Sequence, residues 1–200
     1  MAIEHRKPKR ALETFRERLN SLLRDTITAA PLAPIFAPRP PDGFTAHAEF
    51  SFRDGGRPTA VPLQSKLGEL RLYVGQVCAT HIVGGPLRRT HRVSTQAYTY
   101  HLYVGGAHEP LLRWEYLKQW PDEDARWCRH HLQGPTALDF GSSRVSMADL
   151  HMPTGYVTLE DVIRFCICDL GVQPLDPRKD WHQRLEQTYD EFRSESSPPR

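Results

Sequence analysis

Two neighbouring segments constrain the fold of this chain more than any other part of its sequence. In residues 98–102 of the first segment, 92–104, and in residues 112–116 of the second, 110–116, polar side chains alternate with aromatic or aliphatic ones, and the glycine-containing residues 105–109 separate the two segments. A two-residue period is typical of a β-strand, and a short connection that contains glycine is typical of a hairpin. The two segments therefore predict an antiparallel β-hairpin.

The alternation also predicts the register of this hairpin. With the turn at residues 105–109, His101 pairs with Arg113 and Thr99 pairs with Glu115. The same register opposes large apolar residues in three pairs, Tyr98 with Tyr116, Tyr100 with Trp114, and Leu102 with Leu112. Because successive side chains of a strand point to opposite faces, we expect one aromatic face that packs in the core and one polar face.

Helices are predicted at both ends of the chain. Apolar residues recur at three- and four-residue steps between Pro8 and Ile27, which is the pattern of an amphipathic helix. Thr158 can cap the first turn of a second helix that Gly171 ends, and a third helix is predicted over residues 179–194.

The residues between these helices predict strands and one extended arm. Residues 44–53 alternate apolar and polar side chains, and residues 70–83 read as one or two further strands rich in Leu, Val and Tyr. The prolines within residues 31–43 exclude a helix or a central strand, because proline lacks the amide donor. Residues 118–153 are interpreted as a section rich in loops.

This order of elements predicts an α+β fold, a mainly antiparallel β-sheet with an N-terminal helix and two C-terminal helices packed on it. We expect the amphipathic helix within residues 1–30, a proline-rich arm at 31–43, a single α+β domain at 44–194 and a disordered tail at 195–200. The 200 residues suit one domain of this kind, and two full domains would be cramped.

Charge, cysteine usage and hydropathy narrow the class of protein. A net charge of +2 does not by itself require a polyanionic partner. The four cysteines lack the spacing of a secreted disulfide framework, and no amino-terminal signal segment precedes them. Since no apolar run reaches the roughly 18 residues of a membrane span, we expect a reduced, cytoplasmic protein that does not enter a membrane.

Histidines supply the candidate catalytic residues. Six of the ten histidines lie between His91 and His151. Imidazole titrates near neutrality, so such a cluster is suited to proton transfer or metal binding. The candidate catalytic residues are His101, Arg113 and Glu115 on the polar face of the hairpin, with His131 and His151 from the loop-rich section. An ordinary solvated face of a sheet is the alternative interpretation.

Arginines and one tyrosine are the candidate substrate-binding residues, namely Tyr98, Arg88, Arg89 and Arg144. Metal-free ribonuclease chemistry needs a base near the ribose 2′-hydroxyl, an acid at the leaving oxygen and a cation on the phosphate. These histidines and arginines are the residue types that such a reaction requires.

The sequence favours chemistry without a cofactor. Cys128 and His131 have a zinc-like spacing but lack a second pair, and Cys166 and Cys168 would point in different directions on a helix. The alternative is a metal-binding enzyme that uses His101, His131 and His151 as ligands for Zn²⁺ or Mn²⁺. No Walker loop or dinucleotide fingerprint is present.

The order of several motifs resembles a known family. Tyr98-x-Tyr100-His101 is followed by Arg113-Trp-Glu-Tyr116, by His130-His131, by Leu150-His-Met-Pro153 and by a helix at Leu159-Glu-Asp-Val162. Over residues 91–170 this order is similar to that of the TumE-like toxins of bacterial toxin–antitoxin pairs. The resemblance implies a toxin that pairs with a DNA-binding antitoxin protein and acts on RNA. The long amino-terminal helix, the proline arm and the extended last helix depart from the family pattern.

Two functions from different classes follow. The first is a toxin-like, metal-independent ribonuclease that uses His101, Arg113, Glu115, His131 and His151, with RNA as substrate and an antitoxin protein as partner. The second is a non-catalytic protein-interaction module whose amphipathic end helices bind a partner or form a homodimer.

Overall fold

Antiparallel strands form the centre of the molecule in a computed structural model that describes residues 4–85, 89–118, 129–134, 137–140, 143–146 and 152–195. The strands of the main sheet are β1 (Glu4–His5), β2 (Ala33–Phe36), β3 (Ala46–Ser51), β6 (Val61–Ser65), β7 (Gly68–Val83), β8 (Thr90–Val104), β9 (Leu112–Leu117), β10 (His130–Gln133) and β13 (Met152–Pro153). Two small hairpins are β4 (Arg53–Asp54) with β5 (Arg57–Pro58), and β11 (Ala137–Phe140) with β12 (Ser143–Ser146). The helices are α1 (Pro8–Thr26), α2 (Leu159–Cys168) and α3 (Trp181–Glu195).

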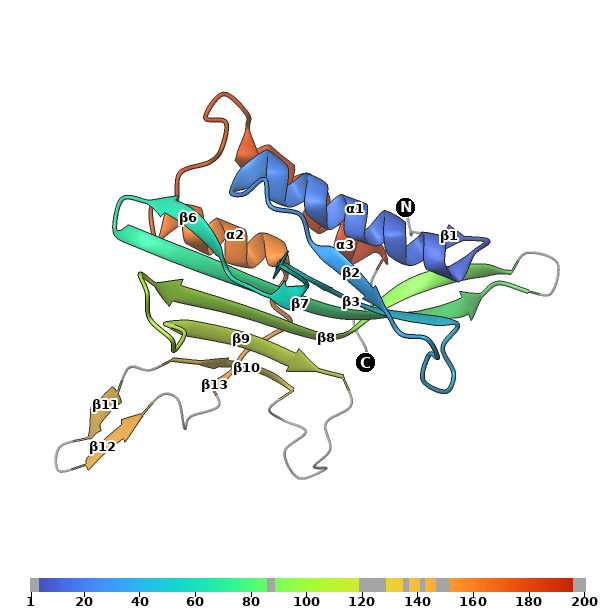
Figure 1. The fold of residues 1–200 in the computed structure, drawn as a ribbon, viewed down its shortest axis with the longest axis horizontal. Coiled ribbons are helices and arrows are strands. Elements are labelled where there is room, and N and C mark those ends of the chain that lie inside the picture. The colour runs from blue at the N-terminus through green and yellow to red at the C-terminus, as the bar shows by residue number, and fades with distance from the viewer. Residues whose placement is uncertain are drawn as a thin grey trace.

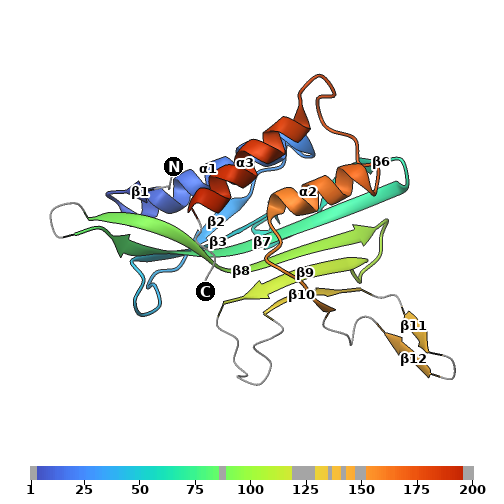
Figure 2. The same ribbon diagram turned by 180° about the vertical axis from the view of Figure 1, so that it is seen from behind.

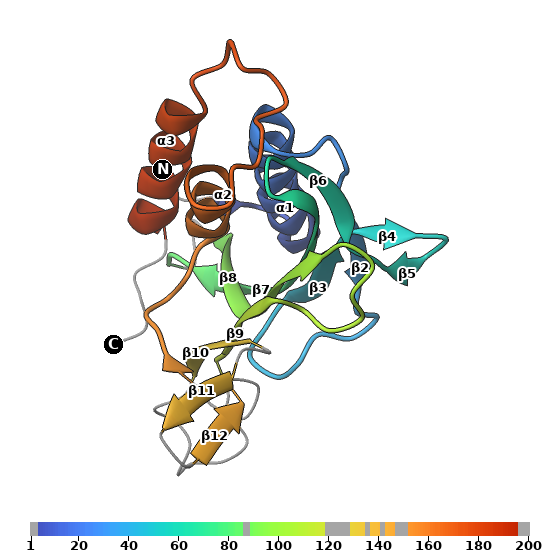
Figure 3. The same ribbon diagram turned by 90° about the vertical axis from the view of Figure 1, so that its left-hand side faces the viewer.

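The main sheet runs in the order β13-β10-β9-β8-β7-β3-β2, with β1 paired to β8 and β6 paired to β7. Figures 1 and 2 view it from opposite sides, and both place the three helices on the same side of the sheet. Figure 3 shows the same layering from the end of the molecule. The predicted α+β fold, with an antiparallel sheet, an N-terminal helix and two C-terminal helices, is confirmed.

The hydrophobic core lies between the sheet and these helices. Helix α1 buries Leu12, Phe15 and Leu22, and the ring of Phe15 lies 6.4 Å from the ring of Phe50 on β3. The apolar face of α1 is therefore occupied by contacts with its own domain.

The predicted hairpin register is confirmed. The structure pairs His101 with Arg113, Thr99 with Glu115, and Tyr100 with Trp114. Tyr100 and Trp114 are buried on the helix side, whereas His101 lies on the opposite side of the same strand. Alternation along the strand sorts the two sets of side chains as the sequence predicted.

Three elements differ from the sequence-based expectations. Part of the proline-rich arm forms β2, an edge strand that pairs with β3 alone. An edge strand tolerates Pro34, because the outer side of the strand needs no N–H donor. Residues 61–65 form β6, a strand that the sequence analysis did not predict. Residues 130–133, which were expected in a loop, form β10 and pair with β9.

The predicted start of α2 is confirmed in detail. Thr158 Oγ1 accepts a hydrogen bond from the amide of Asp161, and the Asp161 carboxylate accepts one from the amide of Thr158. This reciprocal capping box satisfies two amides at the helix start. After the helix, Gly171 adopts a φ of 62°, a left-handed conformation that favours glycine and ends the helix. None of the described helices combines the length and the apolar character that crossing a membrane requires.

Candidate active site on the polar face of the sheet

The polar face is the side of the main sheet opposite the helices, and its central residues are Tyr73, His101, Tyr103, Arg113, Glu115 and His131. These side chains come from the four adjacent strands β7, β8, β9 and β10. Each of them alternates with a neighbour on its own strand that faces the helices, such as Tyr100 beside His101 and Trp114 beside Glu115. The sheet therefore fixes the backbone positions from which all six side chains extend.

Glu115 joins two histidines on this face. Its Oε1 lies 3.0 Å from Nε2 of His101, and its Oε2 lies 3.2 Å from Nε2 of His131. An ionised carboxylate only accepts hydrogen bonds, so both imidazoles present an Nε2–H to it. One carboxylate thereby fixes the orientation of two rings on two different strands.

The contact with Glu115 leaves the other nitrogen of His101 available. When the neutral ring carries its hydrogen on Nε2, Nδ1 has a free lone pair and accepts hydrogen bonds. The hydroxyl of Tyr103 lies 3.4 Å from this Nδ1. The three side chains form a chain of contacts from carboxylate to imidazole to phenol, in which His101 Nδ1 is suited to accept a proton.

The surroundings of Glu115 keep its carboxyl ionised. The hydrogen bond from His101 lowers the pKa of Glu115 below its ordinary value of 4.5, burial opposes this effect, and the nearby charge of Arg113 adds to the lowering. An ionised Glu115 also stabilises a positive charge that forms on either imidazole during proton transfer.

The two histidines differ in their access to solvent. The side chain of His101 is 19% exposed, whereas that of His131 is only 3% exposed. The ring of His101 is therefore accessible from the polar face, whereas the ring of His131 is not. The ring of His131 is thus a buried neighbour of the Glu115 carboxylate.

Aromatic residues border His101 on its own side of the sheet. The ring of Tyr73 lies 5.7 Å from the ring of His101, and the ring of Tyr103 lies 6.2 Å from it. Arg71 places its guanidinium 5.2 Å from the centre of the Tyr103 ring and donates hydrogen bonds to the carbonyls of Gly105 and Ala107. These contacts hold Tyr103 beside the turn of the β8–β9 hairpin.

Tyr73 lies along its strand, over the neighbouring Gly75. A Cβ atom built on Gly75 would come within 2.9 Å of the Tyr73 hydroxyl, so the absence of a side chain at position 75 makes room for this ring. Beyond Gly75, Glu49 on β3 forms an ion pair with Arg53 at 3.0 Å. Burial of the phenol and the charge of Glu49 both raise the pKa of Tyr73, which stays protonated at neutral pH.

Tyr73, Tyr103 and Arg71 were not among the predicted site residues. Tyr103 is two residues from His101 on the same predicted strand, so the alternation that identified His101 also placed Tyr103 beside it. No local signal could place Tyr73, because its contact with His101 depends on the pairing of β7 with β8, which puts the two residues opposite each other.

The structure brings four of the predicted site residues together and separates others from them. His101, Arg113, Glu115 and His131 share the polar face. Tyr98, a predicted substrate-binding residue, is 1% exposed and lies on the helix side, where its hydroxyl accepts a hydrogen bond from the amide of Val157. Tyr98 is therefore a core residue and cannot contact a substrate on the polar face.

Of the arginines that were predicted to bind substrate, the structure describes the positions of Arg89 and Arg144, and neither is on the strands that carry this cluster beside His101. Arg89 precedes β8, and the 12 residues to His101 along an extended strand span roughly 40 Å at about 3.3 Å per residue. Arg144 is on β12, outside the main sheet. Arg88 and His151 lie outside the described residues.

The neighbouring His130 belongs to the other face. Its ring stacks on Tyr116 at 4.3 Å, and burial lowers its pKa. The two consecutive histidines of β10 thus have separate environments, one in the aromatic core and one against Glu115.

The described residues do not include a group of three or more His, Cys, Asp and Glu side chains placed to hold a metal ion. The Nε2 atoms of His101 and His131 both contact the carboxylate of Glu115. Cys128, which shares the zinc-like spacing with His131, lies outside the described residues.

Comparisons of this chain with protein-family models, with curated proteins and with solved structures found no match.

Proposed function

We propose that this protein is a metal-independent ribonuclease whose active centre is His101 on the polar face of the sheet. The observation that supports the proposal is the position of the Glu115 carboxylate between the imidazoles of His101 and His131, with the Tyr103 hydroxyl on the other side of His101. A carboxylate that orients an imidazole, whose second nitrogen points to a hydroxyl, is a recurrent arrangement for general base catalysis.

In the proposed reaction, His101 is the base. Its Nδ1 takes the proton of the ribose 2′-hydroxyl, and the 2′-oxygen forms a bond to the adjacent phosphorus. Glu115 holds the ring and stabilises the imidazolium that results. His131, buried behind Glu115, keeps the carboxylate in place and does not touch the RNA.

Tyr103 is the acid in this scheme. The bond from phosphorus to the 5′-oxygen breaks, and this oxygen takes the proton of the Tyr103 hydroxyl. The phenolate then recovers a proton from Nδ1 of His101, which lies 3.4 Å away. The products are a 2′,3′-cyclic phosphate and a 5′-hydroxyl, and both side chains return to their starting protonation states.

Arg113 supplies the positive charge that the phosphate requires. It lies directly opposite His101 in the β8–β9 pair, and its charge already influences the adjacent Glu115. A guanidinium can donate two parallel hydrogen bonds to a phosphate, and it stabilises the negative charge that develops on the phosphoryl oxygens in the transition state.

The cellular role that fits this chemistry is that of a toxin in a bacterial toxin–antitoxin pair. The motif order over residues 91–170 supports it, and an antitoxin that neutralises the protein would cover or distort the polar face. This role predicts that expression of the chain without its antitoxin arrests growth, and that His101→Ala or Arg113→Ala relieves the arrest.

Product analysis with purified protein tests the proposed reaction. The substrate is a short single-stranded RNA, incubated with an excess of EDTA. We expect cleavage that leaves a 2′,3′-cyclic phosphate, and no cleavage at a position where the 2′-hydroxyl is replaced by hydrogen. Cleavage of the 2′-deoxy position at the same rate, or activity that disappears with EDTA, would contradict a metal-independent attack by the 2′-oxygen.

A further inference from the structure

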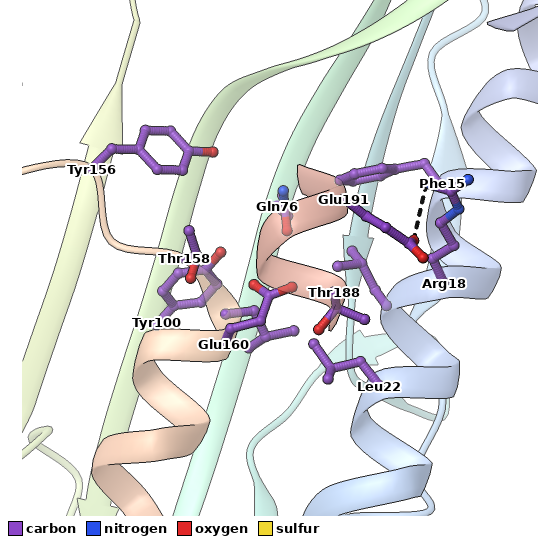
Figure 4. Close-up of a pocket in the computed structure, with 12 residues that line it drawn as sticks. Phe15, Arg18, Leu22, Gln76, Tyr100, Tyr156, Thr158, Glu160, Thr188 and Glu191 are labelled. Atoms are coloured by element: carbon purple, nitrogen blue, oxygen red, sulfur yellow. Dashed lines mark ion pairs between the residues drawn. The ribbon is translucent and has the colours of Figure 1, made fainter. Parts of the chain in front are cut away.

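A cavity lies on the helix side of the sheet, away from the polar face. Side chains from the sheet, from α1, α2 and α3 and from the segment before α2 surround it, as Figure 4 shows. Its polar lining includes Gln76 and Glu160, and its apolar lining includes Phe15, Leu22 and the ring of Tyr100. The volume of about 40 Å³ suits a small polar head group rather than a large ligand.

Gln76 presents an unsatisfied acceptor in this cavity. Its side chain is 3% exposed, and its Nε2 donates a hydrogen bond to the hydroxyl of Thr95 at 3.1 Å. Its Oε1 is buried and has no hydrogen-bond partner in the described part of the chain. A buried carbonyl without a donor costs free energy, and a ligand that donates to it would recover that loss.

Glu160 is the second acceptor. It is 6% exposed and lies in the first turn of α2, and none of the ion pairs among the described residues includes it. Hydrogen bonds from the hydroxyls of Thr158 and Thr188 and from its own amide favour the ionised carboxyl, although they do not cancel the opposite effect of burial. A buried carboxyl with these neighbours lacks a cation to balance its charge.

The charges around Glu160 favour a cation in the cavity. Asp161 on its own helix repels the Glu160 carboxylate, and at the edge of the cavity Glu191 of α3 forms an ion pair with Arg18 of α1 at 3.6 Å. The sheet and the segment before α2 contribute the neutral phenols of Tyr100 and Tyr156. The negative groups thus outnumber the positive ones, and the aromatic rings add surfaces that attract cations.

We propose that this cavity binds the ammonium group of a small primary amine, which donates hydrogen bonds to Gln76 Oε1 and to the Glu160 carboxylate. The alkyl part of the amine lies against the apolar side chains of α1. The site is independent of the polar face, and its occupancy does not require RNA cleavage.

Binding of the ammonium is coupled to release of a proton. Burial raises the pKa of Glu160 above its ordinary value of 4.5, so the carboxyl is protonated over a range of pH in which an exposed glutamate is ionised. A bound cation stabilises the ionised form and displaces the proton. The heat of binding therefore depends on the ionisation enthalpy of the buffer.

Isothermal titration calorimetry with butylammonium chloride tests the site on the full chain. The titrations are carried out in two buffers of different ionisation enthalpy, at one pH between 4.5 and neutrality. We expect binding with proton release, and at least about a tenfold loss of affinity in Glu160→Gln, which corresponds to about 1.4 kcal/mol. Gln76→Leu, which removes the other acceptor, is expected to weaken binding without abolishing proton release.

Control ligands and a control variant make the result specific. Butanol has the same alkyl chain without the charge, and tetramethylammonium has the charge without N–H donors, so both should bind at least about tenfold more weakly than butylammonium. Glu69→Gln makes the same chemical change at an exposed position of β7 and should leave binding unchanged. Absence of butylammonium binding to the folded chain, equal binding by folded Glu160→Gln or Gln76→Leu, or equal binding of butanol would each overturn the proposal.

Discussion

Nε2 of His101 lies 3.0 Å from Oε1 of Glu115, although the two residues are not directly opposite each other in the sheet. His101 pairs with Arg113 and Glu115 pairs with Thr99, so the hydrogen bond runs diagonally between β8 and β9. Diagonal neighbours of a sheet are within reach of long side chains. The same carboxylate reaches His131 on β10, so Glu115 connects three strands at the centre of the polar face.

Replacing Glu115 by Gln should lower kcat for RNA cleavage by about 10²- to 10⁴-fold, the range typical of a lost or misoriented acid–base group. The amide of Gln can donate to Nε2 and so stabilise the wrong tautomer of His101. Because Glu115 does not touch the RNA in this account, KM should change little. Steady-state kinetics separate the two constants, and partial recovery of kcat in Glu115→Asp would support a positioning role. An unchanged kcat in Glu115→Gln would remove Glu115 from the site.

The free energy of unfolding at acid pH should depend on the carboxylate of Glu115. Its pKa is lowered in the folded state relative to the ordinary 4.5, so its interactions stabilise the fold above pH 4.5. This contribution is lost as the pH falls through the lowered pKa, where the folded protein finally binds the proton. Urea unfolding of the wild type and Glu115→Gln should therefore show a difference in unfolding free energy that shrinks on acidification. A difference that stays constant from neutrality to strongly acid pH would contradict the lowered pKa.

Glu160 should have the opposite effect on the pH dependence of stability. Burial raises its folded pKa above 4.5, so the folded state binds the proton more tightly than the unfolded chain does. The free energy of unfolding should fall as the pH rises from 4.5 through the raised pKa, and this fall should be smaller in Glu160→Gln. Chemical unfolding across this pH range measures both, with Glu69→Gln as the matched control. Parallel curves for the wild type and Glu160→Gln would show that Glu160 titrates normally.

Two Tyr→Phe substitutions should separate the two faces of strand β8. The hydroxyl of Tyr98 accepts a hydrogen bond from the amide of Val157 at 3.0 Å. Tyr98→Phe removes this bond, so it should reduce the free energy of unfolding by about 1–2 kcal/mol and leave RNA cleavage unchanged. Tyr103→Phe removes the proposed acid and should slow cleavage by about 10²-fold or more with little effect on stability. Thermal unfolding and cleavage rates measured on both variants give the comparison. Loss of activity in folded Tyr98→Phe would mean that the helix side takes part in the reaction.

The hairpin could be predicted in detail from the sequence because alternation fixes both the faces and the register. A shift of one residue would have moved Tyr100 and Trp114 out of the core together, and the two strands therefore specify each other. The cap at Thr158 and the glycine at position 171 likewise follow from local chemistry, since each residue satisfies a requirement of the backbone beside it.

Other features depend on contacts between distant segments, which local patterns do not contain. β10 has only the residues His130-His-Leu-Gln133, which carry little intrinsic preference for a strand, and it is a strand because β9 and β13 pair with it. β6 had a signal in the alternation of Val61 and Leu63, but the exposed Pro62 interrupts it, and β7 is the strand that pairs with β6 along its length. The burial of Tyr98, which excludes it from the site, follows from the hairpin register that the sequence itself predicted.

The single-turnover rate of RNA cleavage by His101→Ala in the presence of EDTA tests whether His101 is the base of the reaction. His108→Ala is the matched control, because His108 is exposed in the turn of the same hairpin and has no role in the proposed reaction. We expect a loss of at least about 10²-fold in His101→Ala and wild-type activity in His108→Ala, with both variants folded. A wild-type cleavage rate in His101→Ala would contradict the assignment of His101 as the base.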